Sequence, residues 1–180
     1  MTNKMIDFGH NAYLRFRIGT SFLRSPLLLL VRLYWGWQFA QSGWGKLHRL
    51  PQVTEYFASL RIPFPGVNAP FVAGLEFVGG LLLIIGLFSR VTGLLLAVDM
   101  IVAYLAADQE ALHSIFSDPG KFYNVGPYTF LFASLFVLVF GPGRFALDYF
   151  LRRRMEHCYH MNAAHGGTRL MPFGFPDLYN

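Results

Sequence analysis

The sequence predicts an all-α integral membrane protein, built as a bundle of four transmembrane helices. Hydrophobic residues make up 54% of the 180-residue chain and the mean hydropathy is +0.39, which exceeds the values of ordinary soluble domains. Charged residues contribute only 14%, and they fall mainly between or beside the apolar runs. That segregation of charge is typical of a protein that crosses the membrane several times.

Four apolar segments set the number of spans, because a hydrocarbon core about 30 Å thick needs roughly 20 helical residues. We expect spans over residues 26–46, 69–88, 91–107 and 123–140. Only Ser89, Arg90 and their neighbours separate the second span from the third, which predicts a tight antiparallel hairpin.

Segments at both ends and in the first outer loop are expected to lie along the membrane surface. Residues 1–24 mix aromatic and basic side chains, which predicts a basic amphipathic helix, and because Arg32 interrupts the first apolar run we expect no cleavable signal peptide. Apolar residues at helical spacing behind Pro51 predict an interfacial helix over residues 50–60. The stretch "GPGRFALDYFLRRR" breaks the fourth span and then predicts a basic interfacial helix.

These features divide the chain into three parts and give it an orientation. Residues 1–24 form a basic N-terminal segment, 25–150 the membrane domain, and 151–180 a basic, histidine-containing cytoplasmic tail. With four spans both termini share one side, which predicts an N-in, C-in topology in the bacterial cytoplasmic (inner) membrane, because that side would hold most of the basic residues. They are Lys4, Arg15, Arg17, Arg24, Arg90, Arg144, Arg152, Arg153, Arg154 and Arg169.

Several classes of chemistry are disfavoured by the sequence. The net charge of +5 is concentrated beside the spans, which indicates anionic lipid headgroups rather than nucleic acid as the partner. Cys158 is the single cysteine, so a local thiol pair cannot shuttle electrons. The tail "EHCYHMNAAH" fits no standard zinc spacing, and we expect no metal site. His48 and His113 lie outside the spans, so a bis-histidine haem is not expected.

Three ionisable residues lie within the spans, where each costs about 2.5 to 3.5 kcal/mol near the membrane centre. Asp99 stands in a span with eight Leu, Ile or Val residues, which are worth roughly −2 to −5 kcal/mol, so its span should depend on a neighbour. Arg32 is expected at about the same depth, which predicts an Arg32–Asp99 ion pair. Glu76 should lie level with Gln38 and Ser42, held by polar groups of the first span or protonated by burial.

Small residues share helix faces with these polar residues and predict close helix packing. They are Gly36 and Gly43 beside Arg32 and Lys46 on the first span, Ala73, Gly79 and Gly80 beside Glu76 on the second, and Gly93 and Ala97 near Asp99 on the third. Two interpretations stay open at this point. The polar network either only fixes helix register, or it forms a ligand or proton site.

Several stretches together resemble the DoxX family of small four-span bacterial membrane proteins. They are "RLYWGWQFAQSGWGKL", "IPFPG", "GLEFVGGLLLIIGLFSR" and "GPGRFALD", and the resemblance covers about residues 27–148. The recurrent family positions fall on Arg32, Gly43, Lys46, Glu76, Gly79, Gly80, Gly86, Arg90, Gly141, Pro142, Gly143 and Asp148. The N-terminal segment and the long tail depart from the family core.

The resemblance implies a four-helix membrane bundle associated with quinone-linked or thiol-linked redox systems. Family members look like subunits of thiosulfate:quinone oxidoreductase or partners of superoxide dismutase and sulfurtransferase. The family label does not itself establish catalysis.

Three functions are compatible with these features. We favour a non-catalytic accessory subunit that anchors or stabilises a larger redox or energy-transducing membrane complex, because the chain lacks haem ligands, a redox thiol pair and a nucleotide motif. The alternative is a quinone-binding oxidoreductase component that exchanges protons through Glu76 and Asp99 while a partner protein supplies electrons. A small transporter is less favoured, because the four spans contain no repeat.

Overall fold

The computed structural model describes the backbone of residues 2–164 and the side chains of residues 23–155. This part of the chain contains eight α-helices and no strand, so the all-α class is confirmed. The helices are α1 (Thr2–His48), α2 (Leu50–Ser59), α3 (Pro65–Ile85), α4 (Ser89–Ala106), α5 (Gln109–His113), α6 (Pro119–Asn124), α7 (Pro127–Phe140) and α8 (Leu147–Ala164).

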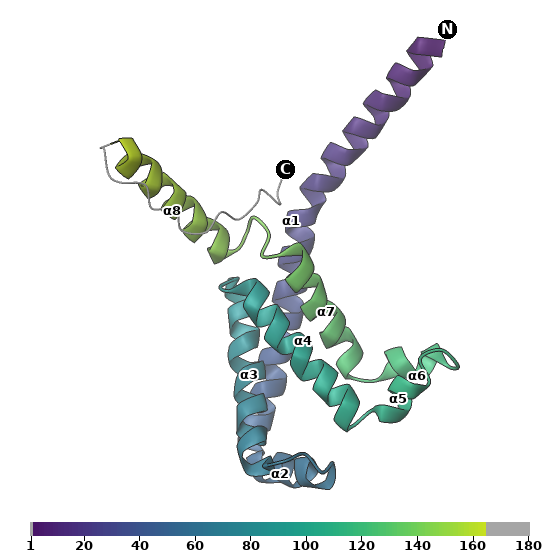
Figure 1. The fold of residues 1–180 in the computed structure, drawn as a ribbon, viewed down its shortest axis with the longest axis vertical. Coiled ribbons are helices and arrows are strands. Elements are labelled where there is room, and N and C mark those ends of the chain that lie inside the picture. Colours follow the sequence, from purple (N-terminus) through teal and green to yellow (C-terminus); the bar gives the residue numbers. More distant parts are fainter. Residues whose placement is uncertain (1, 165–180) are drawn as a thin grey trace.

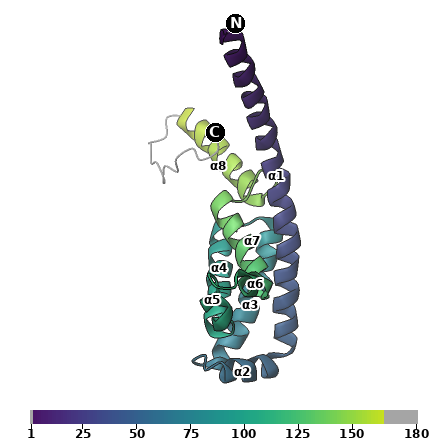
Figure 2. The same ribbon diagram turned by 90° about the vertical axis from the view of Figure 1, so that its right-hand side faces the viewer.

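Four of these helices pack around a shared core. α1 contacts α3, α3 contacts α4, α4 contacts α7, and α7 contacts α1, which closes the group (Figure 1). α2 lies across one end of the bundle, while α8 and the N-terminal part of α1 extend from the opposite end, as both views show (Figure 2). The core side chains Phe39, Leu83, Leu96, Met100 and Val137 come from all four helices.

Two helices, α3 and α4, are long and apolar enough to cross a membrane, and α7 is a shorter apolar helix of 14 residues. The first predicted span is the C-terminal part of α1, a single helix that continues through Pro26. No helix end therefore marks the boundary expected at residue 24, since a proline can bend a helix without ending it. The amphipathic face expected over residues 1–24 falls almost wholly outside the described side chains.

Other predicted elements differ from the structure in their limits. The loop helix after Pro51 is present as α2. The fourth predicted span begins four residues too early, because Val125 is extended and Gly126 and Pro127 start a new helix. α8 runs across the boundary expected at residue 151, and residues 165–180 of the predicted tail lie outside the described residues.

The outer surface of the bundle is apolar. Trp37 on α1, Val78 on α3, Ile101 on α4 and Val139 on α7 are each 45–66% exposed. A protein surrounded by water rarely exposes contiguous apolar surface of this kind. The surface is therefore suited to contact with lipid.

Candidate functional site

Glycines bring α1 and α3 into backbone contact next to the polar residues. A Cβ added at Gly80 would lie 2.5 Å from the amide nitrogen of Ala40, and one at Gly36 would lie 2.9 Å from the carbonyl oxygen of Gly80. A side chain at Gly43 would overlap the backbone at Phe77. Only glycine allows the helices to approach this closely, so side chains that face the seam on either helix can reach across it.

Glu76 is held across this seam by two residues of α1. Nζ of Lys46 donates a hydrogen bond to Oε1 of Glu76 at 2.6 Å, and Oγ of Ser42 donates to Oε2 at 3.0 Å. Glu76 is 2% exposed, whereas the Lys46 side chain is 32% exposed. Polar groups of the first predicted span thus hold this carboxylate, and each of its oxygens has a partner.

Asp99 adds a second carboxyl from α4. It is 9% exposed, and its Oδ2 atom is buried with no hydrogen-bond partner. It lies close enough to Glu76 and Lys46 to interact with the charges of both. Native proteins leave few buried polar atoms unpaired. The free oxygen is therefore the unusual feature of this group of four residues, which we name the carboxyl cluster: Ser42, Lys46, Glu76 and Asp99.

Two predicted neighbours of the cluster have other surroundings. Gln38 is half-buried on α1 and takes no part in the hydrogen bonds described for Glu76. Gly79 faces α4, where a Cβ would lie 3.1 Å from the Leu96 side chain. Gly79 thus serves the packing of α3 on α4, while Gly36, Gly43 and Gly80 serve the packing of α1 on α3.

The predicted Arg32–Asp99 ion pair is wrong. Arg32 is 1% exposed and donates to three backbone carbonyls: Nε to Leu83 at 2.9 Å, Nη1 to Pro142 at 2.6 Å and Nη2 to Ile84 at 3.1 Å. The depth estimate failed because it counted the depth of Arg32 from Pro26, which does not lie level with the start of α4. Gly36 packs against Gly80 and Ile84, which places Arg32 one turn further on, level with the end of α3.

Around Arg32 the structure forms a second polar centre that ties three segments together. Asp148 accepts hydrogen bonds from the backbone nitrogens of Phe88 at 2.8 Å and Ser89 at 2.9 Å, and so caps the start of α4. Its own nitrogen donates to the carbonyl of Gly86 at 3.0 Å. Gly86 has a φ of 76°, and a side chain there would overlap the Arg32 guanidinium. This centre closes the helix ends and leaves no oxygen of Asp148 open for a ligand.

The predicted turn residues lie beside this second centre. Gly141 and Gly143 have φ values of 76° and 73°, a conformation that favours glycine. Between them, Pro142 presents the carbonyl that Arg32 binds. The turn after α7 therefore serves to hold Arg32 in place.

The carboxyl cluster can both donate and accept hydrogen bonds and can hold protons. It offers an ammonium group, a hydroxyl group and two carboxyl groups in an apolar surround. Ionisable groups of this kind within membrane proteins often form proton relays. In the described part of the chain no group of three His, Cys, Asp or Glu residues is arranged to hold a metal. The tail motif "EHCYHMNAAH", at which we expected no metal site, spans residues 156–165, and its side chains all lie outside the described ones, which end at Met155.

Sequence reasoning did not identify the partners of Arg32 or the capping role of Asp148. Backbone carbonyls leave no trace in a sequence, so Leu83, Ile84 and Pro142 could not have been chosen. For Asp148, the signal was its position after "GPGRFAL", where a carboxylate can return to the preceding helix hairpin. Lys46 lies one turn beyond Ser42 on α1, and its long side chain can still reach the carboxylate of Glu76 on α3.

The chain is similar in sequence to a family of membrane proteins and to individual bacterial membrane proteins. Residues 27–109 match the family model described as DoxX. The chain is 27% identical over 129 residues to the inner membrane protein YqjF of Escherichia coli, which covers 71% of this chain and 93% of that relative. No solved structure matches.

Two further relatives have similar coverage. An uncharacterized membrane protein, Rv3486, of Mycobacterium tuberculosis is 29% identical over 145 residues, or 74% of this chain and 86% of the relative. A putative oxidoreductase, CatD, of Bacillus subtilis is 29% identical over 136 residues, or 76% of this chain and 89% of the relative.

Proposed function

The chain belongs to the DoxX family of membrane proteins, through a domain over residues 27–109, and on that premise we propose that it is a quinone-binding component of a membrane oxidoreductase. A partner protein supplies the electrons, and the carboxyl cluster exchanges the protons. The name of the Bacillus subtilis relative, a putative oxidoreductase, agrees with this class of reaction.

The observation that carries the proposal is the free oxygen of Asp99. A network that only fixes helix register would be expected to satisfy both oxygens of a buried carboxyl, as Asp148 does beside Arg32, although the hydroxyl of Ser89 in that centre has no partner. In the carboxyl cluster, Glu76 has two partners while Oδ2 of Asp99 has none. This contrast between the carboxyl groups of Asp99 and Asp148 favours a ligand or proton site over a purely structural network.

The residues fit the head group of a quinone. A quinone carries carbonyl oxygens, which need donors, and its reduced form carries hydroxyl groups, which need acceptors. Nζ of Lys46 is a donor, and Oδ2 of Asp99 is an unpaired buried oxygen. When bound, a quinone takes up two electrons and two protons on reduction. Lys46 and Asp99 would hold and orient it.

The charge balance of the cluster assigns a role to each carboxyl. The Lys46 ammonium and the Glu76 carboxylate cancel each other at 2.6 Å, so Asp99 is left without a cation of its own. An unpaired charge in an apolar surround is costly, and a proton on Asp99 makes the cluster neutral. Asp99 is thus the group that gives and regains a proton, while Glu76 keeps Lys46 in position.

The topology belongs to the same proposal. We take α1, α3, α4 and α7 as four spans of the bacterial inner membrane, with both termini in the cytoplasm. The N-terminal part of α1 and helix α8 extend from the same end of the bundle, which supports an even number of spans (Figure 2). Three exposed arginines follow α7 on this side: Arg144 lies in the turn before α8, and Arg153 and Arg154 lie on α8. Anionic lipid headgroups would bind them there.

Gentle detergent purification tests the function directly. We expect the wild-type chain to retain close to one quinone per protein, together with an electron-donating partner. Asp99→Asn should lose most of the quinone, whereas Asp118→Asn, a matched change of an exposed aspartate, should retain it. A wild-type protein without quinone, in a complex that Asp99→Asn and Glu76→Gln both leave intact, would contradict the proposal.

That contradicting result would favour the second candidate, a non-catalytic accessory subunit. One observation supports this candidate. Tyr34, Trp37, Gln41 and Trp44 lie on one exposed face of α1, and the polar amide of Gln41 is better matched by another protein than by lipid. Gln41→Leu should release the partner if the face is an interface and should leave quinone binding unchanged.

A further inference from the structure

An apolar layer separates the carboxyl cluster from the end of the bundle that holds Arg32. Phe39, Leu83 and Leu96 are each at most 1% exposed and pack together in the core. On α4, Leu96 lies three residues from Asp99 in the direction of Arg32, and on α3, Leu83 lies seven residues from Glu76 in the same direction. These separations correspond to about 5 and 10 Å at 1.5 Å per residue. Leu96 also fills the space over Gly79, so apolar side chains from α1, α3 and α4 fill this layer.

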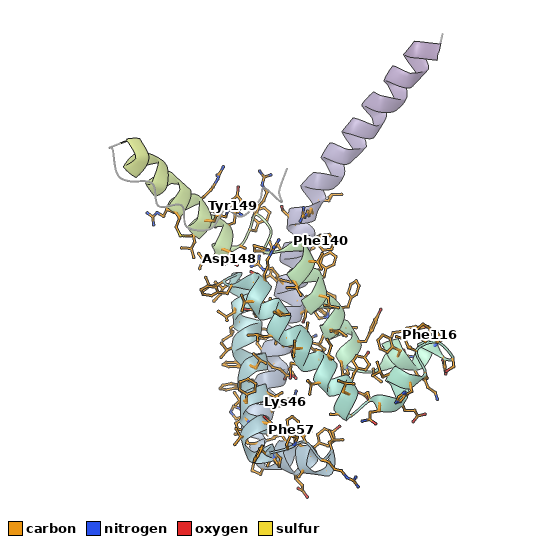
Figure 3. The ribbon with its side chains drawn as sticks, in the orientation of Figure 1. Lys46, Phe57, Phe116, Phe140, Asp148 and Tyr149 are labelled. Carbon is orange, nitrogen blue, oxygen red and sulfur yellow. The ribbon has the colours of Figure 1, made fainter. Side chains whose placement is uncertain are left out.

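On the opposite side, Lys46 is the ionisable residue through which the cluster reaches the surface, and Ser42 is also partly exposed. Lys46 lies two residues before the end of α1, and its side chain is 32% exposed, while Glu76 is 2% and Asp99 9% exposed. Figure 3 shows Lys46 toward the end of the bundle occupied by α2 and its Phe57, with Asp148 at the other end. The ammonium group therefore links the buried carboxyls to water on the α2 side.

We propose that the carboxyl cluster is open to one side of the membrane only, the side of α2, and that Lys46 is the residue through which protons reach it. The inference deepens the proposed function, because it assigns a direction to the proton exchange. Three ionisable groups face the cluster, one from each helix that forms it: Lys46 from α1, Glu76 from α3 and Asp99 from α4. On the fourth helix, α7, Ser134 lies beside Gly93, on the Arg32 side of Leu96, and its hydroxyl donates to the carbonyl of Phe130.

The proton transfer conserves charge and atoms. A proton leaves Nζ of Lys46 and binds a carboxylate oxygen of Glu76, at the 2.6 Å contact between them, and Lys46 regains a proton from water on the α2 side. Glu76 then passes its proton to Asp99 once Asp99 has given up its own. Arginine cannot take this role, because its guanidinium is not deprotonated in proteins.

Cysteine labelling tests the one-sided opening without any quinone. The background is the full chain with Cys158→Ser, which removes the single cysteine. Ser42→Cys then probes the cluster and Thr92→Cys probes α4 beyond the apolar layer, where Thr92 is 4% exposed. Tyr56→Cys on α2 and Met155→Cys on α8, which are 53% and 67% exposed, report which side a membrane-impermeant thiol reagent reaches.

Each labelling outcome decides the matter. We expect Ser42→Cys to react from the side that labels Tyr56→Cys, at least tenfold faster than from the side that labels Met155→Cys, and Thr92→Cys to react from neither. Leu96→Ala should open the layer and admit the reagent from the second side. Reaction of Ser42→Cys from both sides, from the Met155 side or from neither would overturn the inference.

A second readout tests Lys46 itself. Infrared spectroscopy follows the exchange of deuterium into a protonated carboxyl, and Asp99→Asn identifies the band. Lys46→Arg keeps the positive charge beside Glu76 but should slow the exchange at least tenfold, whereas Lys121→Arg, in the exposed pair with Glu110, should not. An unchanged rate in Lys46→Arg would remove Lys46 from the route.

These experiments separate the inference from the proposed function. One-sided labelling in a chain that binds no quinone would support the one-sided opening of the cluster and would contradict the proposed quinone site. Two-sided labelling in a chain that binds quinone through Asp99 would do the reverse.

Discussion

Lys46 donates a 2.6 Å hydrogen bond to Glu76 across a helix seam that only glycines make possible. The pair is asymmetric, since Glu76 is 2% and the Lys46 side chain 32% exposed. Loss of the lysine leaves a buried carboxylate with one hydroxyl donor, whereas loss of the carboxylate leaves a cation that can turn to water. This asymmetry leads to the first prediction.

Lys46→Met should lower the free energy of unfolding by about 1 to 3 kcal/mol, since it strands the Glu76 carboxylate in an apolar surround, although the partial exposure of Lys46 limits the effect. Adding Glu76→Gln should recover part of that loss. Thermal unfolding in detergent measures both. Lys121→Met breaks the exposed pair with Glu110 at 3.3 Å and should change stability by less than about 1 kcal/mol. Equal effects of the two lysine variants would contradict the buried pair.

Arg32→Lys should destabilise the protein by about 2 to 4 kcal/mol, despite keeping the charge. A lysine cannot reproduce the planar set of donors that reaches the carbonyls of Leu83, Ile84 and Pro142, and the carbonyls left unpaired carry a penalty. Arg24→Lys is the control, because Arg24 is exposed and donates to the carbonyl of Phe140. If Arg32→Lys unfolded at the wild-type temperature, the carbonyl contacts would not be holding the helix ends.

Gly80→Ala and Gly74→Ala should act in opposite directions, although both lie on α3. A Cβ at Gly80 meets the backbone of α1 at 2.5 Å, whereas a Cβ at Gly74 has no neighbour within 4 Å. The first change should cost about 1 to 3 kcal/mol, and the second should stabilise α3 by up to about 1 kcal/mol, because alanine favours helix more than glycine does. Unfolding of the two purified variants, measured side by side, checks the seam.

Asp148→Ala should weaken the start of α4, because its carboxylate satisfies the nitrogens of Phe88 and Ser89. We expect a loss of about 1 to 2 kcal/mol, as for other helix caps, and faster hydrogen exchange at these two amides. Asp118→Ala is the matched control, since Asp118 precedes α6 without a side-chain capping bond. Unaltered exchange at Ser89 would show that the cap does not hold the helix.

The sequence allowed part of this account to be predicted. Residue types and helical spacing were enough to place Ser42, Lys46 and Glu76 among the interacting residues and to mark Gly36, Gly43 and Gly80 as contact positions. Helix spacing alone carries that information, because residues three or four apart share a face.

The pairing of charges could not be predicted in the same way. The relative depth of two residues depends on how the helices are aligned. Nothing in the apolar run from Pro26 indicates that Arg32 lies level with the end of α3, where it binds the carbonyls of Leu83 and Ile84. Backbone carbonyls as partners leave no sequence pattern, so the ion pair was predicted with Asp99, the carboxylate expected at the depth of Arg32. The break before α7, in contrast, was readable from Gly126 and Pro127.

Oδ2 of Asp99, which has no hydrogen-bond partner, is proposed to form part of a quinone site. A binding titration tests this most directly. Purified protein is titrated with a short-tailed quinone while tryptophan fluorescence is followed, with Asp118→Asn as the control for aspartate loss. We expect saturable binding that Asp99→Asn weakens at least tenfold, or by about 1.4 kcal/mol. The same affinity in Asp99→Asn as in the wild type, or no saturable binding to the wild type, would contradict it.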